Sequence, residues 1–201
     1  MRRLPTDQRR AELIAAAIRV IARDGLASAT TRAIVTEAEM PHGALYYIFE
    51  NREDLIAAVI AQVTESERSA ALFGLDLAAS GSVDVAELAY TAIDGFLGTI
   101  TATPSSELVL LEVAVHALRS DPPTAAAQWD TYRQAACITV DYVAALAGIG
   151  WSAPREDVAR YLVAQLDGLT IAWLADRDTD AARRTARLIA TSLAALAVPA
   201  T

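Results

Sequence analysis

The sequence predicts an all-α protein, in which an N-terminal three-helix domain is joined by a long helix to a larger helical body. Apolar residues recur at helical spacing along nearly the whole chain, and no segment shows the convincing alternation of a β-strand. Breaks containing proline or glycine, such as Pro104, Pro122-Pro123 and 148–154, separate the later periodic segments. With 201 residues, 54% of them hydrophobic, the chain can bury a core of ordinary size.

Three helices are predicted in the first fifty residues. The first runs from about Asp7 to Asp24, where Asp24-Gly25 is a helix stop signal. Thr30 and Thr31 can cap a short second helix. Pro41 cannot extend that helix but can begin a third, from about 41 to 48. Three helices with a tight turn between the last two have the layout of a helix-turn-helix.

Six further helices are predicted after this domain. Asn51 is a good N-cap for the first of them, because Glu53 and Asp54 then meet the positive end of the helix dipole, and this helix extends to about Ala71. A linker is predicted over 74–82. The remaining helices are expected near 84–101, 105–119, 124–147, 155–175 and 179–197.

The distribution of charge is uneven, and it excludes several classes of protein. Residues 1–55 contain eight arginines and eight acids, whereas residues 56–201 contain nine arginines and seventeen acids, and the whole chain carries −8. Four arginines among the first ten residues suggest a polyanion nearby, although a solubilising tail has the same composition. No stretch is long and apolar enough for a membrane span or a signal peptide. Cys137 is the single cysteine, so the chain cannot form an internal disulfide, which agrees with a reducing compartment. We therefore expect a cytoplasmic protein without a membrane partner.

The predicted third helix has the chemistry of a surface that reads a DNA groove. Its residues are Pro41-His42-Gly43-Ala44-Leu45-Tyr46-Tyr47-Ile48-Phe49. Leu45, Ile48 and Phe49 can face inward. The other side chains are then left for the outer face, where small residues allow close approach to a groove and tyrosine hydroxyls can bond phosphates.

At these residues the sequence resembles the TetR/AcrR family of transcriptional repressors. The similarity covers about the first quarter of the chain, through Arg10-Ala11, 13–16, Gly25, 30–34, 43–46, Phe49 and 51–55. It implies a DNA-binding domain over 1–55 with its helix-turn-helix near 31–50, and a helical ligand-binding and dimerisation domain over 56–201. The resemblance implies phosphate contacts for Thr31, Tyr46 and Arg52, and base or groove contacts for Arg32, His42, Gly43, Ala44 and Tyr47.

The sequence also departs from the family pattern. Glu39 stands in the turn where the family usually has glycine, which predicts local strain or a different bend. Pro41 replaces the serine that usually caps the reading helix, and Ile48 replaces a common histidine or tyrosine.

A dimer interface is predicted on the last two helices. The segment after Pro154 has one apolar stripe that can face its own core and a second, rich in small residues, that allows close approach of another helix. The expected interface residues are Tyr161, Ala164, Gly168, Ile171, Ala175, Ile189, Leu193 and Leu196. These helices resemble the four-helix dimer interface of the family, and a palindromic DNA site requires two readers.

The body also offers candidate residues for a small-molecule site. Aromatic side chains with a few polar groups are typical of such a cavity. The candidates are Tyr90, Phe96, Glu112, His116, Trp129, Tyr132 and Tyr142. Glu112 and His116 share a helical face but are too few for a metal site, so neither a metal nor a cofactor is expected.

The sequence therefore favours a homodimeric repressor that binds a palindromic double-stranded DNA operator and is released by an unknown small-molecule effector. An all-helical small-molecule-binding protein without DNA-binding activity is the alternative, and a steep salt dependence of DNA affinity would distinguish the two. An enzyme is not expected, because the chain has no G-x-S-x-G, P-loop, H-E-x-x-H or G-x-G-x-x-G motif.

Overall fold

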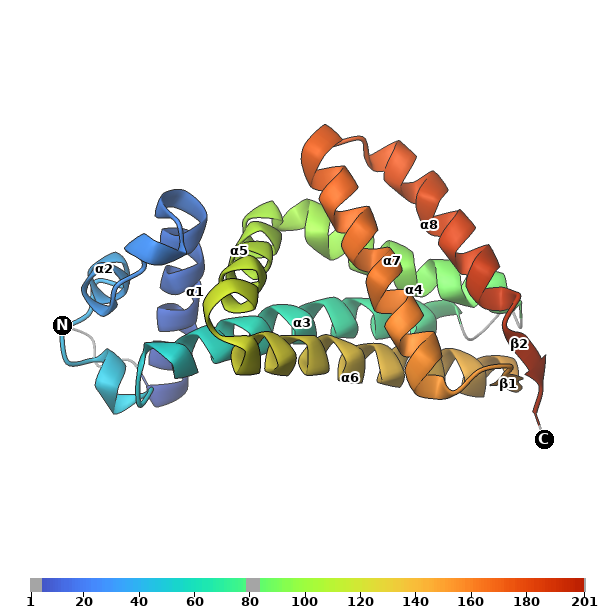
Figure 1. Cartoon of the computed structure of the whole chain (residues 1–201), viewed down its shortest axis with the longest axis horizontal. Helices are drawn as coiled ribbons and strands as arrows, with labels where there is room; N and C mark the ends of the chain where they lie inside the picture. The colour runs from blue at the N-terminus through green and yellow to red at the C-terminus, as the bar shows by residue number, and fades with distance from the viewer. Residues whose placement is uncertain (1–4, 79–83, 201) are drawn as a thin grey trace. The chain divides into compact units, whose positions relative to one another are not determined.

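The computed structural model describes residues 5–78 and 84–200, and these residues are almost entirely helical (Figure 1). The α-helices are α1 (Thr6–Asp24), α2 (Thr31–Glu37), α3 (Arg52–Ala78), α4 (Val85–Ala102), α5 (Pro104–Ser120), α6 (Pro122–Ala147), α7 (Arg155–Asp176) and α8 (Thr179–Ala194). Two 3₁₀ helices, η1 (Leu26–Ser28) and η2 (Leu45–Tyr47), and two short strands, β1 (Ile149–Trp151) and β2 (Ala197–Pro199), complete the described chain. The predicted all-α class is confirmed.

The chain divides into two compact units. Unit 1 contains residues 1–63 together with 105–128, and unit 2 contains residues 64–104 and 129–201. Thus α5 and the first residues of α6 belong to the same unit as the N-terminal helices, although they are distant from them in sequence. The helices α3 and α6 each contribute residues to both units.

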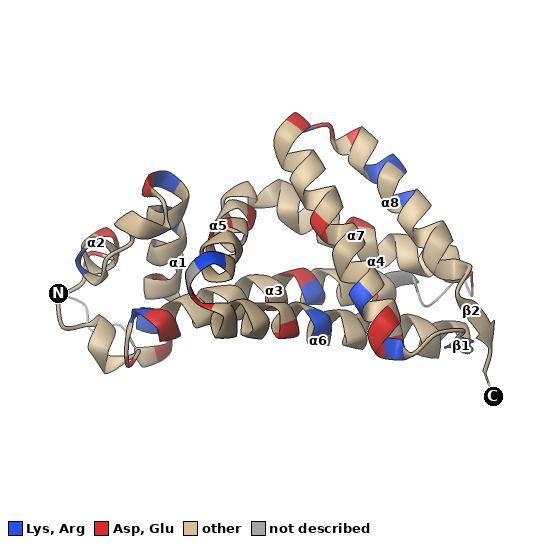
Figure 2. Cartoon of the chain, viewed as in Figure 1, with Lys and Arg blue, Asp and Glu red and all other residues tan. Residues whose placement is uncertain are grey.

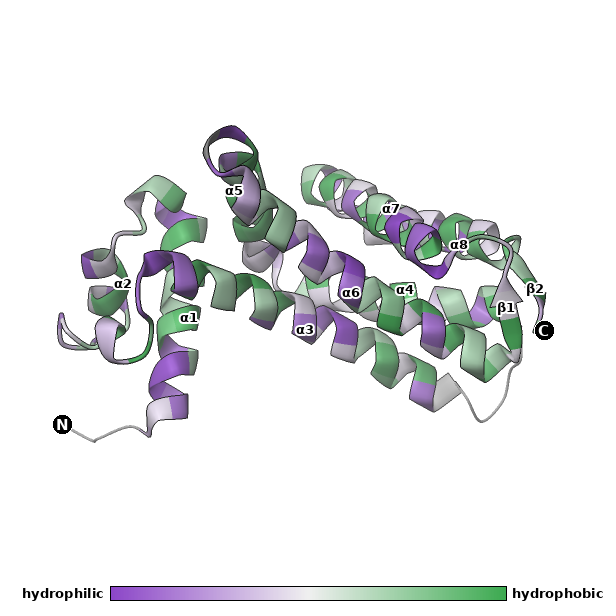
Figure 3. Ribbon diagram, turned by 60° about the horizontal axis from the view of Figure 1, so that its bottom comes forward, coloured by the Kyte–Doolittle hydropathy of each residue, from purple (hydrophilic) through white to green (hydrophobic). Residues whose placement is uncertain are grey.

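Helix α1 ends where the sequence indicates. Gly25 has a positive φ of 83°, and its N–H donates to the Ile21 carbonyl at 2.8 Å. Thr30 caps α2 by accepting a hydrogen bond from the Ala33 N–H at 3.2 Å. Figure 3 shows α1 with hydrophilic residues at its N-terminal end and hydrophobic ones further along, where Leu13 and Val20 are buried.

The turn after α2 contains the strain that Glu39 predicts. Glu39 has a φ of 52°, in the left-handed region that glycine adopts most easily. Its N–H donates to the Thr36 carbonyl at 3.1 Å, and the Met40 N–H donates to the Val35 carbonyl at 2.8 Å, which together form a Schellman motif. The chain thus forms the usual helix ending, although the left-handed conformation of Glu39 costs about 1 kcal/mol.

The predicted helix over 41–48 is not continuous. Residues 42–44 form a turn, and only η2, at 45–47, is helical. Its hydrogen bonds are short-range: the Ala44 N–H donates to the Pro41 carbonyl and the Ile48 N–H to the Leu45 carbonyl. Gly43 has a low helix propensity, and a segment this short gains little from the cooperativity that extends a helix.

The start of α3 agrees with the sequence, but its end does not. The Asn51 side chain accepts a hydrogen bond from the Asp54 N–H at 2.8 Å, as the N-cap prediction requires. The helix then continues to Ala78, beyond the expected end near 71 and into the predicted linker. The remainder of that predicted linker, residues 79–82, lies outside the described residues.

In unit 2, α4 packs against α7 and α8. The apolar stripe of α7 that the sequence assigns to its own core is buried here, with Val158, Leu162 and Trp173 at 5% exposure or less. The same cluster contains residues of α4, α6 and α8, so one core joins the later helices of the chain.

Two short strands follow α6 and α8, although no strand was expected. The strands β1 and β2 pair antiparallel, with Gly150 opposite Val198, and the Ser152 N–H donates to the Leu196 carbonyl at 2.8 Å. The predicted last helix therefore ends at Ala194 rather than near 197. Three residues per strand are too few to show an alternating pattern in a sequence.

Within residues 5–78 and 84–200, no helix has both the length and the hydropathy needed to cross a bilayer.

Candidate nucleic-acid interface

The segment 41–49 is held by two buried side chains and presents two exposed ones. Leu45 is fully buried and Phe49 is 5% exposed, so this segment is anchored to unit 1. Between these anchors, Tyr46 is 64% exposed and Tyr47 is 85% exposed. Two adjacent aromatic side chains at such exposure form a surface that a partner could contact.

Most of the residues expected to touch DNA are accessible. Arg32, His42 and Gly43 are exposed, as are the two tyrosines, and Thr31 is partly exposed as the first residue of α2. Ala44 differs from the expectation, because its side chain is buried at 9% exposure. It lies in the turn 42–44, directly before the fully buried Leu45.

Arg52 has a different environment from the one expected for a phosphate-binding residue. Its Nε donates to the Ala29 carbonyl at 2.8 Å, and its Nη2 donates to the Leu26 carbonyl at 2.6 Å. Both acceptors are backbone groups of the connection between α1 and α2. The guanidinium therefore fixes the start of α3 to this connection, and only its remaining N–H groups are left for a phosphate.

Glu112 holds the same connection from α5. Its Oε1 accepts a hydrogen bond from the Leu26 N–H at 2.7 Å, so the Leu26 peptide groups are bonded on one side by Glu112 and on the other by Arg52. A Cβ on Gly25 would lie 3.2 Å from this carboxylate oxygen. We call Arg52, Glu112 and the backbone of 26–29 the clamp. One oxygen of Glu112, a predicted ligand-binding residue, is thus engaged in unit 1.

Replacing Arg52 by alanine is expected to destabilise unit 1 by about 1–3 kcal/mol, because two carbonyls lose charge-assisted donors. Glu112→Ala is expected to have a smaller effect, and Glu112→Gln a smaller one still, since the amide oxygen can accept the same bond. Amide hydrogen exchange at Leu26 and chemical unfolding measure both. Arg32→Ala is the matched control, because Arg32 is exposed. An equal loss in Arg32→Ala would contradict the clamp.

The other candidate ligand-binding residues lie in different surroundings. Tyr90, Phe96, Trp129 and Tyr132 pack, partly buried, against the main core cluster of unit 2, and Tyr142 packs against a second cluster of that unit. His116 is exposed on α5, in unit 1 with Glu112.

The polar groups and rings of the aromatic candidates differ in what they contact. The Tyr142 hydroxyl bonds the Asp76 carboxylate, which raises the pKa of the tyrosine. The Arg187 guanidinium lies 3.9 Å from the centre of the Tyr90 ring. The Trp129 Nε1 is buried and has no hydrogen-bond partner within the described residues, so Trp129 keeps a donor that a ligand could use.

Sequence reasoning missed Asp167, which is half-buried on α7. Burial alone raises the pKa of its carboxyl group. An aspartate on a helical face that otherwise resembles the solvent side gives no such signal in the sequence.

The residues expected to form a dimer interface fall into two groups. On α7, Ala164, Gly168, Ala175 and Ile171 are exposed, the last at 54%, and Tyr161 is partly buried with its hydroxyl 2.9 Å from Ser192 Oγ. On α8 and just after it, the expected residues face inward. Ile189 and Leu193 are buried in the core of their own unit, and Leu196 packs against that core. The face of α8 that carries Leu188, at 71% exposure, is the accessible one.

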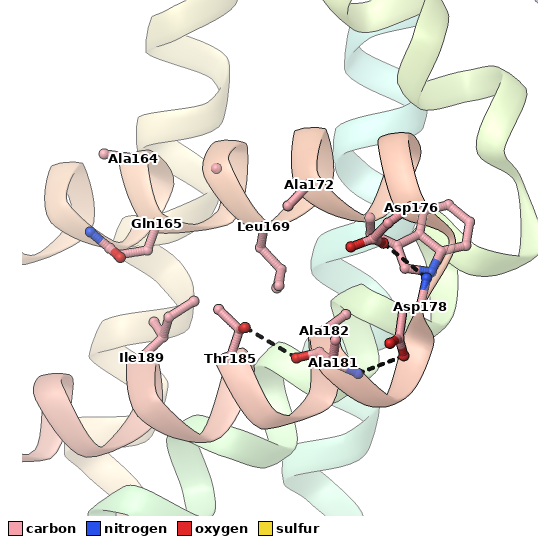
Figure 4. A pocket seen from close by; sticks show the side chains of 12 residues that line it. Ala164, Gln165, Leu169, Ala172, Asp176, Asp178, Ala181, Ala182, Thr185 and Ile189 are labelled. Carbon is pink, nitrogen blue, oxygen red and sulfur yellow. Dashed lines mark hydrogen bonds between the residues drawn. The ribbon is translucent and has the colours of Figure 1, made fainter.

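A groove of about 190 Å³ lies between α7 and α8. Figure 4 shows Leu169 at its floor, with Ala164 and Ala172 along the α7 side and Thr185 on the α8 side. The groove is lined mainly by small and apolar side chains. It therefore continues the exposed small-residue stripe of α7 and could accept side chains of another helix.

Comparisons with known proteins agree with this architecture. The family described as "Bacterial regulatory proteins, tetR family" matches residues 13–59. The chain is 29% identical over 176 residues to the HTH-type nicotine-responsive transcriptional repressor HdnoR of Paenarthrobacter nicotinovorans, covering 87% of this chain and 88% of that one.

Solved structures show the same fold. The multidrug binding protein EbrR, complexed with imidazole, is 26% identical and superposes with a TM-score of 0.64 over 96% of this chain and 97% of its own. A TetR transcription regulator from Haloarcula marismortui, at 19% identity, gives 0.68 over 96% of this chain and the whole of its own, which is a likeness of fold alone. The matching family and HdnoR are described as regulators rather than as enzymes. Residues 13–59 thus match the N-terminal domain of TetR-family regulatory proteins, and most of the chain is similar in sequence to a transcriptional repressor.

Proposed function

We propose that the chain is a homodimeric repressor that acts in the cytoplasm, binds a palindromic DNA operator and releases it when a small molecule binds. The observation that carries the DNA-binding part is the exposure of Tyr46 and Tyr47 on a segment anchored by buried Leu45 and Phe49. An anchored segment with small residues at its start can enter a groove, where side chains contact phosphates and base edges.

The exposed stripe of α7 supports the homodimer. Apart from the adjacent turns of its own helix, an added Cβ on Gly168 would meet nothing within 4 Å, so a partner helix could approach its backbone closely. The adjoining groove supplies space for side chains of that partner. We call residues 41–49 the reading segment. Two copies of the chain would then present two reading segments, as a palindrome requires.

The descriptions of two relatives support the proposal of a small-molecule effector. HdnoR is described as nicotine-responsive, and EbrR as a multidrug binding protein. In this chain, unit 2 offers partly buried aromatic side chains and the buried Trp129 N–H, which fit a small organic molecule with an aromatic ring and a hydrogen-bond acceptor. Binding that favours one arrangement of the body would lower DNA affinity by the same coupling free energy.

Selection of duplexes from a random library, followed by anisotropy titration, tests the DNA-binding part. We expect one palindromic sequence to be enriched, and Arg32→Ala or Tyr47→Ala to weaken its binding by about 10–100-fold, which corresponds to about 1–3 kcal/mol for each lost base contact. Arg184→Ala, also an exposed helical arginine but on α8, should bind like the parent protein. Failure to enrich any sequence would favour a small-molecule-binding protein without DNA-binding activity.

A further inference from the structure

The charge of the DNA-reading part is unusual for a protein that binds a polyanion. We define the reader as the described residues 5–63. It contains six arginines and eight carboxylates, a formal charge of −2, and no lysine. General attraction to DNA comes almost wholly from cations that displace counterions from phosphates. The reader therefore has little net charge with which to attract an arbitrary duplex.

Two of the six arginines are paired with carboxylates of the reader. Arg19 bonds Glu12 and Glu37, each at 2.8 Å, and Arg23 bonds Asp24 at 2.9 Å and Glu37 at 3.0 Å. Hydrogen bonds from both arginines hold the pKa of Glu37 below its ordinary value. These ion pairs lie on α1 and α2, and within them the positive and negative charges offset each other.

The other arginines, with one exception, also have partners. Arg52 donates to the backbone of the clamp, the Arg10 guanidinium lies 4.8 Å from the centre of the Phe49 ring, and Arg9 has an interaction of its own. Only Arg32, among the arginines of residues 5–63, has no ion pair, hydrogen bond or ring contact there. It is exposed in the first turn of α2.

The carboxylates nearest to the reading segment in sequence oppose general attraction. Glu39 precedes this segment, and Glu50, Glu53 and Asp54 follow it, and all four are exposed. No ion pair joins any of them within the reader. Figure 2 shows basic and acidic ribbon side by side at the start of α3. A phosphate approaching there meets negative side chains as well as Arg52.

We propose that this reader recognises its operator mainly through uncharged groups, with Arg32 as its one uncommitted cation, and has almost no affinity for arbitrary DNA. The proposal rests on the proposed function and specifies its recognition chemistry. His42, Tyr46 and Tyr47 are exposed and supply hydrogen bonds and aromatic surface. Selectivity for the operator then arises because other DNA is bound very weakly. In the alternative, the protein would bind all DNA strongly through its charge and gain further affinity from base contacts at the operator.

The proposal is tested by the salt dependence of binding to the enriched duplex and to a scrambled duplex of equal length. Two copies of Arg32, with a share from Arg2 and Arg3, give an expected slope of log affinity on log salt no steeper than about −3, because the adjacent Glu53 and Asp54 offset the charge that Arg52 keeps. Affinity should then fall about 10–100-fold between about 50 and 200 mM salt, instead of the 10³–10⁵-fold typical of 6–10 phosphate contacts. The scrambled duplex should show no saturable binding even at the lower salt concentration.

Matched variants separate the possible sources of the slope. Arg32→Ala should make the slope shallower by about 2, because each dimer loses two cations, whereas Arg19→Ala should leave it unchanged. Arg2→Ala with Arg3→Ala measures the share of the N-terminal arm. Glu50→Gln with Glu53→Gln should raise affinity for the scrambled duplex about tenfold, if these carboxylates repel phosphates.

The outcomes distinguish this proposal from the proposed function. A slope steeper than about −6, or equal slope changes in Arg32→Ala and Arg19→Ala, would overturn the charge argument while leaving a DNA-binding regulator. If no duplex is enriched, the proposed function fails. Tight binding to the scrambled duplex at low salt would overturn the charge argument in either case.

Discussion

Gly95→Ala is expected to destabilise the protein by about 2–4 kcal/mol, an effect far larger than one added methyl group would suggest. A Cβ at this position of α4 would lie 2.7 Å from the Ala70 carbonyl oxygen and 3.0 Å from its carbon. Both atoms are backbone of α3, which cannot rotate away as a side chain can. The two helices would have to separate, and the neighbouring core of unit 2 would lose contacts.

Gly98→Ala is the matched control for this prediction. Gly98 lies less than one turn further along the same helix, and an added Cβ there meets nothing within 4 Å. Alanine has the higher helix propensity, so Gly98→Ala should stabilise the protein by up to about 1 kcal/mol. Urea unfolding followed by circular dichroism measures both variants. Similar free energies of unfolding for the two alanine variants would refute the close α3–α4 approach.

Gly168→Arg is expected to convert the proposed dimer into a monomer and to lower affinity for the palindromic duplex by about 10²–10⁴-fold. The reduction arises because each reading segment then binds its half-site without the effective concentration supplied by the other. The chain itself should fold normally, since the new side chain points into open space on α7. Native mass spectrometry gives the subunit number, and anisotropy gives the affinity.

The control for Gly168→Arg is Gly98→Arg, the same substitution at another exposed helical glycine with open space around it. It should leave both the dimer and DNA binding intact. A Gly168→Arg protein that remains dimeric would place the interface elsewhere than on the α7 stripe.

Residues with a strong local signal were predictable from the sequence. The Thr30 and Asn51 caps and the Gly25 ending follow from side-chain and backbone preferences within three or four residues. Glu39 was identified as a source of strain or of a different bend because the family that the sequence resembles usually has glycine at this place in the turn. The same local logic failed for η2, since hydrophobic spacing does not distinguish a short α-helix from a turn followed by a 3₁₀ helix.

The roles of Arg52 and Glu112 could not be predicted, because their partners are distant in the sequence. Glu112 is 86 residues from the Leu26 N–H that it bonds, and Arg52 reaches carbonyls 23 and 26 residues away. A sequence pattern reports which face of a helix is apolar, but not which backbone group a charged side chain will meet. The misassigned face of α8 has the same origin: Ile189 and Leu193 form an apolar stripe whether they cover their own core or a partner.

By itself, the sequence determined the helical class, most helix boundaries, the resemblance to TetR-family regulators and the proposed reading segment with its two tyrosines, because all of these depend on short-range preferences and on residues close together in the chain. Only the tertiary structure decided that α5 shares a compact unit with the N-terminal helices, that Arg52 and Glu112 clamp one connection, and that Arg32 alone among the arginines of the reader has no partner. The physical reason is that hydrogen bonds and ion pairs form between whichever groups folding brings within about 3 Å of each other, and such proximity is a property of packing rather than of sequence order.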